Sequence, residues 1–153
     1  MTKQRWCWTA VLLVACGGGT APVQPSNSAA ATVKGFMQAV ADSNLAKMAS
    51  LWGTANGPAA KTRQPQDYER RIAVMQAYLR SDSYRLTSDV AETPDRRVVQ
   101  VEIRRQACTW SVPFVTIKAA DHSWLINQVD LTAAGNPARP CVQGTGADTL
   151  PKR

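Results

Sequence analysis

The chain has 153 residues, of which 44% are hydrophobic and 19% charged, and its formal net charge is +7. This length suits one domain with its own hydrophobic core and is too short for two domains of ordinary size. Basic residues are interspersed with acidic ones, and no basic run exceeds two residues. The charge pattern therefore indicates a solvated surface and argues against a nucleic-acid-binding protein.

Residues 1–15 have the layout of a secretory signal, in which a short basic start precedes a mostly apolar run over residues 6–15. That run is about half as long as the roughly 20 residues that a membrane-spanning helix requires. The motif Leu13-Val14-Ala15-Cys16 resembles the lipobox of bacterial lipoproteins, and ordinary signal-peptidase cleavage after Ala15 is the alternative. The resemblance implies that residues 1–15 are removed, that the Cys16 sulfur receives a diacylglycerol, and that the new amine is acylated, as with palmitate.

A lipidated Cys16 would attach the protein to a membrane of the bacterial cell envelope, because two or three acyl chains anchor firmly where one is marginal. Gly17 occupies the position where an aspartate retains such proteins at the inner membrane, so the outer membrane, with the domain facing the periplasm, is favoured. Residues 17–28 are rich in Gly, Pro and Ser, which predicts a flexible tether.

The cysteines are consistent with an oxidising compartment. Cys7 would leave with the signal and Cys16 would carry lipid, so Cys108 and Cys141 remain. Two such cysteines can pair, and we predict a disulfide between them. The alternatives are two free thiols or a redox or metal-binding role. The chain has one histidine and no CxxC motif, so we predict no metal site.

The first half of the domain predicts helices. Apolar residues at three- and four-residue steps over 29–41 indicate an amphipathic helix. Asn44 is placed to cap a second, short helix that runs to Trp52. Residues 54–64 are expected to form a loop, after which Pro65 is well placed to open a third helix with its buried side between Tyr68 and Leu79.

From Tyr84 onward the apolar period changes to two, which predicts strands at about residues 84–90, 97–105, 110–118 and 124–131. Pro113 is unusual in a central strand because it cannot donate a ladder hydrogen bond, so it indicates a bulge or an edge. Residues 133–153 contain several Gly and Pro residues and are expected to form an irregular tail. Helices followed by antiparallel strands predict an α+β fold over residues 29–132.

This order of elements resembles the nuclear-transport-factor-2-like (NTF2-like) superfamily. The resemblance lies in an opening helix that ends FMQAVAD at residues 36–42, a second helix over 44–52, the segment WSVPF at 110–114, and the closing strand at 124–131. It implies N-terminal helices packed against a strongly bent antiparallel sheet. Together they would form a cone, often with a pocket at its open end.

Two residues are candidates for acid–base chemistry. His122 is the single histidine, but it falls in a predicted turn, where an exposed position is the simpler interpretation. Asp130 lies on the last predicted strand and would either point inward or act as a solvated or helix-capping residue. Neither has an evident partner in a dry pocket, and the chain has no phosphate loop or metal-ligand cluster. We therefore predict no catalytic residue and no cofactor.

Aromatic residues are spread over every predicted element and are expected mainly in the core. Trp110, Phe114 and Trp124 could instead line an apolar cavity inside the cone. Arg97 and Arg105 share a strand face with the apolar stretch between them, so each would either pair with a ligand carboxylate or extend from the strand end into solvent.

The sequence is thus interpreted as a membrane-anchored envelope lipoprotein that acts as a non-enzymatic binding or assembly module. Its partners would be an apolar small ligand, another envelope protein, or a second copy bound through the open face of the sheet. The alternative is a small cone-fold enzyme, such as an isomerase or dehydratase acting on an apolar small molecule.

Overall fold

The computed structural model describes residues 28–139 and Cys141. Cys16, the predicted signal and residues 17–27 of the predicted tether lie outside the described residues. In chain order, the helices and strands are α1 (Ala29–Ala41), α2 (Leu45–Leu51), β1 (Gly53–Thr54), β2 (Gly57–Pro58), α3 (Ala59–Thr62), α4 (Tyr68–Leu79), β3 (Ser83–Thr93), β4 (Arg96–Arg105), β5 (Cys108–Lys118), β6 (Trp124–Val129) and the 3-10 helix η1 (Leu131–Ala134). Helices packed on an antiparallel sheet confirm the predicted α+β class.

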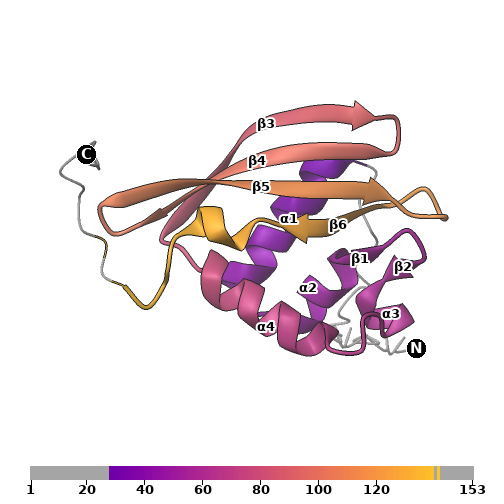
Figure 1. The fold of residues 1–153 in the computed structure, drawn as a ribbon, viewed down its shortest axis with the longest axis horizontal. Coiled ribbons are helices and arrows are strands. Elements are labelled where there is room, and N and C mark those ends of the chain that lie inside the picture. Colours follow the sequence, from indigo (N-terminus) through magenta and orange to yellow (C-terminus); the bar gives the residue numbers. More distant parts are fainter. Residues whose placement is uncertain (1–27, 140, 142–153) are drawn as a thin grey trace, which may run out of the picture.

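The helix α1 forms where the apolar stripe predicted it. Ser28 caps its first turn by accepting a hydrogen bond from the Ala31 amide, at 3.2 Å. Val33, Phe36 and Val40 lie on the buried side of the helix. Figure 1 shows α1 passing behind the sheet, and it contacts all four long strands. The helix therefore supplies one wall of the core along the whole width of the sheet.

The segment between α2 and α4 is more structured than the loop expected over residues 54–64. It contains the β1–β2 hairpin and the single helical turn of α3. A Cβ at Gly53 would lie 2.3 Å from the Gly57 carbonyl oxygen, so the two short strands approach too closely for a side chain there. Elements of two to four residues leave no periodic pattern, which is why the sequence did not predict them.

The capping of α2 is confirmed, whereas the start of the next helix differs from the prediction. Asn44 Oδ1 accepts a hydrogen bond from the Lys47 amide at 2.9 Å. The helix α4 begins at Tyr68 rather than at Pro65, and the Tyr68 amide donates to the Pro65 carbonyl in the preceding turn. In Figure 1, α4 lies along the β6 side of the sheet.

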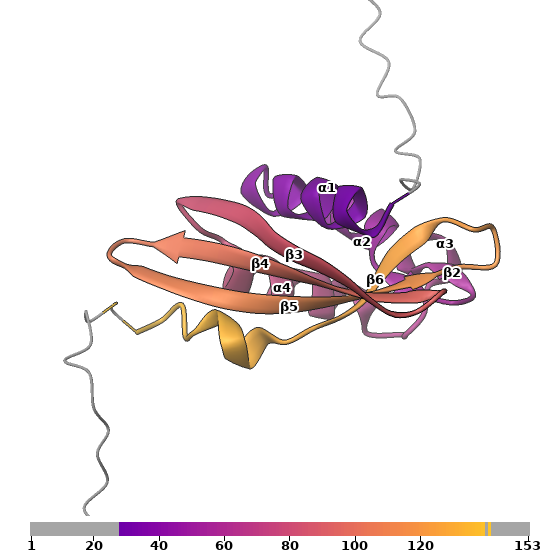
Figure 2. The ribbon, with the colours of Figure 1, turned by 90° about the horizontal axis from the view of Figure 1, so that it is seen from above.

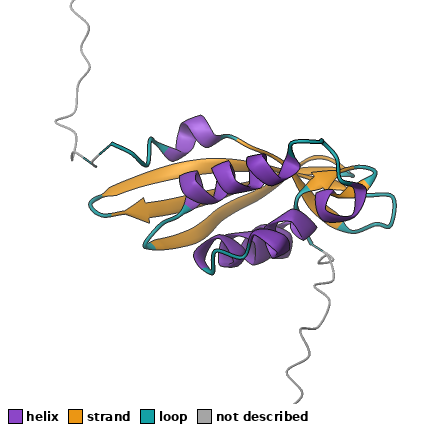
Figure 3. Ribbon diagram, turned by 90° about the horizontal axis from the view of Figure 1, so that it is seen from below, coloured by secondary structure: helices purple, strands orange, loops and turns teal. Residues whose placement is uncertain are grey.

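The long strands pair in the order β3-β4-β5-β6, all antiparallel. The strands are strongly twisted, as Figure 2 shows, and Figure 3 presents the helices against them from below. Extra residues interrupt the register at Thr87 and Glu92 in β3 and at Asn127 in β6. Such bulges bend a strand and increase its local twist. The sheet curves at these points, as the expected fold requires.

Pro113 lies inside β5, opposite Gln100 of β4, and is not itself the bulge that the sequence suggested. The Pro113 carbonyl accepts a hydrogen bond from the Asp130 amide, just after β6. In an antiparallel ladder the N–H and C=O of one residue face the same neighbour. The missing N–H therefore faces the end of β6, and the β4–β5 ladder loses no hydrogen bond.

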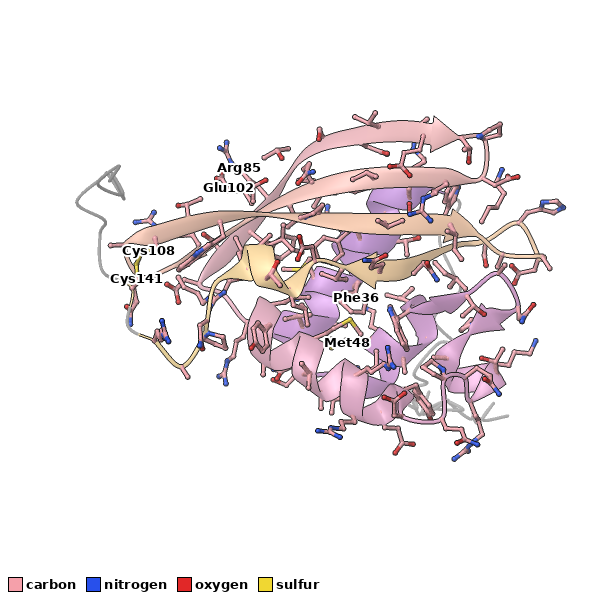
Figure 4. All side chains as sticks on the ribbon, viewed as in Figure 1. Phe36, Met48, Arg85, Glu102, Cys108 and Cys141 are labelled. Atoms are coloured by element: carbon pink, nitrogen blue, oxygen red, sulfur yellow. A yellow bond between two sulfur atoms is a disulfide. The ribbon has the colours of Figure 1, made fainter. Side chains whose placement is uncertain are left out.

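The core lies between α1, α2, α4 and the concave face of the sheet. Its largest fully buried side chains include Phe36, Phe114, Met37 and Met48. The Phe36 and Phe114 rings meet edge to face, with centroids 6.2 Å apart. Figure 4 shows Phe36 and Met48 in the space between the helices and the strands. Polar pairs such as Arg85 with Glu102, at 2.7 Å, occupy the opposite, outer face.

The described structure continues past residue 132. Asp130 is followed by η1, whose Ala134 is fully buried, and η1 contacts both α4 and β5. Cys108 at the start of β5 and Cys141 are joined as a disulfide, with their Cα atoms 5.9 Å apart (Figure 4). The two cysteines that the sequence predicted to pair are thus at bonding distance.

Candidate ligand-binding sites

A mostly apolar cavity lies between α4 and β6 and has a volume of about 310 Å³. The residues that line it are Trp52, Asp67, Arg70, Arg71, Val74, Met75, Asn127, Gln128, Val129 and Leu131. The apolar members form the walls, and the two arginines come from the first half of α4. A concave, mostly apolar site with a few polar groups is the usual form of a small-molecule pocket.

The polar groups of this cavity differ in how they are engaged. Arg71 Nε donates to both carboxylate oxygens of Asp67, at 2.9 and 3.0 Å. That hydrogen bond is the main reason why the pKa of Asp67 lies below its usual value. Within residues 28–139, no carboxylate is hydrogen-bonded to Arg70. Arg70 therefore has its donors available to a ligand, and the Nη groups of Arg71 also have no carboxylate partner among residues 28–139.

The bulge at Asn127 places β6 at the edge of this cavity. Its extra residue turns the Asn127 side chain toward the β1–β2 hairpin, where Nδ2 donates to the Gly53 carbonyl at 3.1 Å. This contact joins β6 to the segment that follows Trp52, another lining residue. One wall of the cavity is therefore held by backbone and side-chain hydrogen bonds rather than by a free loop.

A second cavity, of about 320 Å³, lies where α4 ends and the β4–β5 hairpin turns. Its lining residues are Ala77, Arg80, Ser81, Asp82, Arg105, Gln106, Trp110, Pro137, Arg139 and Cys141. The lining is more polar than that of the first cavity and includes three arginines and one carboxylate. The disulfide to Cys108 holds Cys141 in the wall of this second cavity.

Arg105 is held at the centre of several contacts beside the second cavity. Its guanidinium carbon lies 4.6 Å from the centroid of the Trp110 ring, a cation–π contact. Its Nη2 donates to the Tyr78 carbonyl at 3.1 Å and also to the Ala134 carbonyl. Burial lowers the pKa of Arg105, and the Asp82 carboxylate opposes that change. Arg105 thus joins the end of α4 to η1. It does not extend freely into solvent from the strand end, which was one of the two positions expected from the sequence.

The five residues named as pocket-lining candidates are not brought together. Trp110 and Arg105 line the second cavity. Phe114 is fully buried in the core and Trp124 is 7% exposed, beneath the ammonium of a lysine. Arg97 Nε donates to the Asp89 carboxylate at 2.6 Å. Phe114, Trp124 and Arg97 line neither of these two cavities.

The two acid–base candidates lie elsewhere. His122 is exposed in the turn before β6, with a positive φ of 64°. Asp130 caps η1, because its Oδ1 accepts hydrogen bonds from the Thr132 amide and hydroxyl at 3.0 and 2.6 Å. These bonds lower the pKa of Asp130. Neither residue lines a cavity described here, and the capping interpretation of Asp130 agrees with its contacts.

Sequence reasoning did not find the cavity between α4 and β6. A signal was nonetheless present at Val74, which falls off the buried stripe of α4 formed by Ile72, Met75 and Leu79. The side chain of Val74 is 41% exposed. A single exposed apolar residue is common on protein surfaces, so this signal could not identify the cavity without the neighbouring β6.

Across residues 28–139 and Cys141, no helix is long and apolar enough to cross a membrane. The same residues contain no cluster of three or more His, Cys, Asp and Glu side chains that could hold a metal ion.

No protein-family model matches the chain, and no curated protein matches it. Two solved structures are similar in fold. A "putative ketosteroid isomerase" from Shewanella frigidimarina NCIMB 400 is 20% identical, with 67% of this chain and 93% of that chain covered and a TM-score of 0.47. An NTF-2 like protein of unknown function from Shewanella oneidensis MR-1 is 12% identical, with 65% and 91% covered and a TM-score of 0.43. At these values the matches say nothing about activity, and the expected α+β fold is confirmed by the chain's own element order and strand pairing.

Proposed function

We propose that this protein is a lipid-anchored binding module of the bacterial cell envelope, and that the cavity between α4 and β6 takes a small amphiphilic molecule. The ligand would have an apolar body and one anionic group. The observation that carries this proposal is the lining of that cavity, in which apolar walls meet an arginine with available donors.

The size and chemistry of the cavity support such a ligand. Its volume of about 310 Å³ is at the lower end of the roughly 300–1,000 Å³ of small-molecule pockets. Trp52, Met75 and Val129 offer apolar contact, and burial of an apolar ligand surface there is the main favourable term. Arg70 would pair with the anionic group through charge-assisted hydrogen bonds. Together these features favour recognition of a compact carboxylate or sulfonate.

The titratable groups of the cavity favour binding over acid–base catalysis. Asp67 is the single carboxylate of its lining, and the hydrogen bond from Arg71 holds its pKa below the usual value. A general base works best with a pKa near the working pH, so a lowered pKa makes Asp67 a weak base. We therefore favour the binding module over the isomerase or dehydratase alternative.

The proposed ligand class is tested with 2-naphthoate as the probe. The full chain, purified in a nonionic detergent, is titrated while NMR follows the indole N–H of Trp52. A saturable shift is expected. Val74→Glu should weaken binding about tenfold or more, because the new carboxylate enters the apolar wall and pairs with arginines one turn earlier. Arg70→Gln should weaken it about three- to tenfold.

Matched controls separate the cavity from general surface effects. Val90→Glu changes another exposed valine, on β3, and Arg80→Gln removes an arginine from the other cavity. Both variants should bind the probe as the unmodified chain does. Absence of a saturable shift, or equal weakening by Val74→Glu and Val90→Glu, would refute the assignment of the site.

Anchoring is tested separately, in bacterial cells. The proposal of a lipid anchor rests on the lipobox at Leu13-Val14-Ala15-Cys16. The unmodified chain should fractionate with membranes, and mass spectrometry should show acyl chains on Cys16. Cys16→Ser should release the chain from membranes, whereas Cys7→Ser, inside the predicted signal, should not. A Cys16→Ser variant that stays on membranes would contradict lipid anchoring.

A further inference from the structure

The second cavity, at the end of α4, has an unusual balance of charge. Arg80, Arg105 and Arg139 line it, and Asp82 is the single carboxylate among its lining residues. Asp82 already accepts a hydrogen bond from the Gln106 amide through Oδ2, at 2.7 Å. The cavity therefore has positive charge that its own carboxylate does not balance.

Arg105 is the most buried and most fixed of the three arginines. Its Nη2 donates to two carbonyls and its guanidinium stacks on Trp110, but Nε is buried and has no hydrogen-bond partner in the described part of the chain. Arginine stays charged when it is partly buried, because its pKa is so high. Within residues 28–139 no carboxylate forms an ion pair with this guanidinium, whose hydrogen bonds go to carbonyls, so the cavity beside it favours an anion.

Arg80 and Arg139 approach the cavity from different segments. Arg80 directly follows α4, and Arg139 precedes the disulfide. Both side chains are exposed, and among residues 28–139 neither forms an ion pair. They contrast with Arg71, Arg85, Arg96 and Arg97, each of which is paired with a carboxylate. Arg63, Arg70 and Arg104 also lack an ion pair, so what distinguishes Arg80 and Arg139 is that both line this cavity.

The wall that carries Arg139 depends on two features of the tail. Gly135 lies against Trp110 so closely that a Cβ there would be 2.5 Å from the indole Nε1. Six residues later, Cys141 bonds to Cys108 at the start of β5. Pro137, Arg139 and Cys141 therefore form one side of the cavity, and the disulfide holds that side in place.

We propose that this cavity is a phosphate-binding site, completed by the Cys108–Cys141 disulfide. A phosphate group offers several oxygen acceptors in a compact shape, which suits three guanidinium groups that approach from different segments. Asp82 opposes the anion and sets its affinity. The phosphate comes from a soluble phosphorylated compound or from the headgroup of an anionic lipid. This site is separate from the proposed amphiphile cavity and shares no lining residue with it.

The probe for the first arm is inorganic phosphate, with the full chain in nanodiscs of phosphatidylcholine. NMR follows the indole N–H of Trp110. A saturable shift is expected, and Arg80→Gln or Arg139→Gln should each weaken binding about three- to tenfold. Asp82→Asn should strengthen binding by a similar factor, because it removes the opposing charge. Arg70→Gln, in the other cavity, is the matched control and should leave phosphate binding unchanged.

The second arm replaces part of the phosphatidylcholine with phosphatidylglycerol. If the lipid headgroup binds at this site, phosphatidylglycerol should compete with free phosphate and lower its apparent affinity, and this effect of the lipid should be absent in Arg80→Gln. If phosphatidylglycerol leaves the phosphate affinity unchanged, the natural ligand is a soluble phosphate. Reduction of the disulfide, or Cys141→Ser, should weaken phosphate binding about as much as Arg139→Gln does. No saturable shift with phosphate, or equal affinity in Arg80→Gln, Asp82→Asn and the unmodified chain, would overturn the site. Unchanged affinity after reduction would overturn the role of the disulfide.

Discussion

Removal of the disulfide should lower the stability of the domain by an amount that follows from its position in the chain. Cys108 and Cys141 are 33 residues apart. On the chain-entropy model, closing a loop of that length stabilises the folded state by about 4 kcal/mol at 25 °C. For a domain of this size, that difference corresponds to a fall in the thermal midpoint of roughly 10–20 °C.

The native fold should survive this change. Arg105 still joins η1 to the end of α4, and Gly135 still packs on Trp110. The loss should therefore arise mainly in the unfolded chain, which regains the conformations that the bond had excluded.

The assay compares thermal unfolding, by far-UV circular dichroism at pH 7, of the oxidised full chain and its Cys108→Ser/Cys141→Ser double variant. The reduced unmodified chain is the control for the serine substitutions, and its thermal midpoint should equal that of the double variant. A destabilisation below about 1 kcal/mol would refute the chain-entropy reasoning. Two free thiols in material exported from the cell would refute the bridge itself.

Three further predictions concern the core, the tail and the pH dependence. Phe114→Ala should cost about 3–5 kcal/mol in denaturant unfolding, because the ring is fully buried against Phe36; a cost below about 1 kcal/mol would contradict that packing. Gly135→Ala should destabilise the domain and perturb the Trp110 indole signal in NMR, since φ is +67° and the new Cβ would clash; an unchanged spectrum would show that the contact is absent. Stability should be nearly constant from pH 7 to about 5 and fall below about pH 4.5, because hydrogen bonds lower the pKa of four carboxyl groups in the folded state. A group with a lowered folded pKa contributes stability above its unfolded pKa and loses it as pH falls through the folded value. In high salt, the stability that the arginine–carboxylate pairs contribute should decrease, because salt screens exposed charges. Thermal midpoints that rise on acidification would contradict this prediction. The four groups and their main donors are Asp67 with Arg71, Glu102 with Arg85, Asp121 with Ser123, and Asp130 with Thr132.

Much of the fold could be predicted because it depends on local periodicity. The stripe of α1 and the alternation in β4 each bury one face, so Val33 and Val101 could be placed in the core from spacing alone. The Asn44 cap depends on a hydrogen bond within three residues, and it was predicted correctly. The β1–β2 hairpin was not predicted, because its strands are too short for a period and depend on a close approach between Gly53 and Gly57.

The sequence by itself predicted the class of the fold and the strand faces, because both follow from spacing. It also predicted a disulfide between Cys108 and Cys141, with two free thiols or a redox or metal role as the alternatives, and the structure places these two cysteines together. Only the tertiary structure decided where the cavities lie. Alternation placed Arg105 and Trp110 on the inner face of their strands, but it could not show that α4 ends beside them and that the tail returns across them. Likewise, Arg70 and Val129 are distant in sequence and line one cavity because α4 lies on the β6 side of the sheet. A cavity is bounded by elements that no local pattern relates, so its lining appears only after the chain has folded.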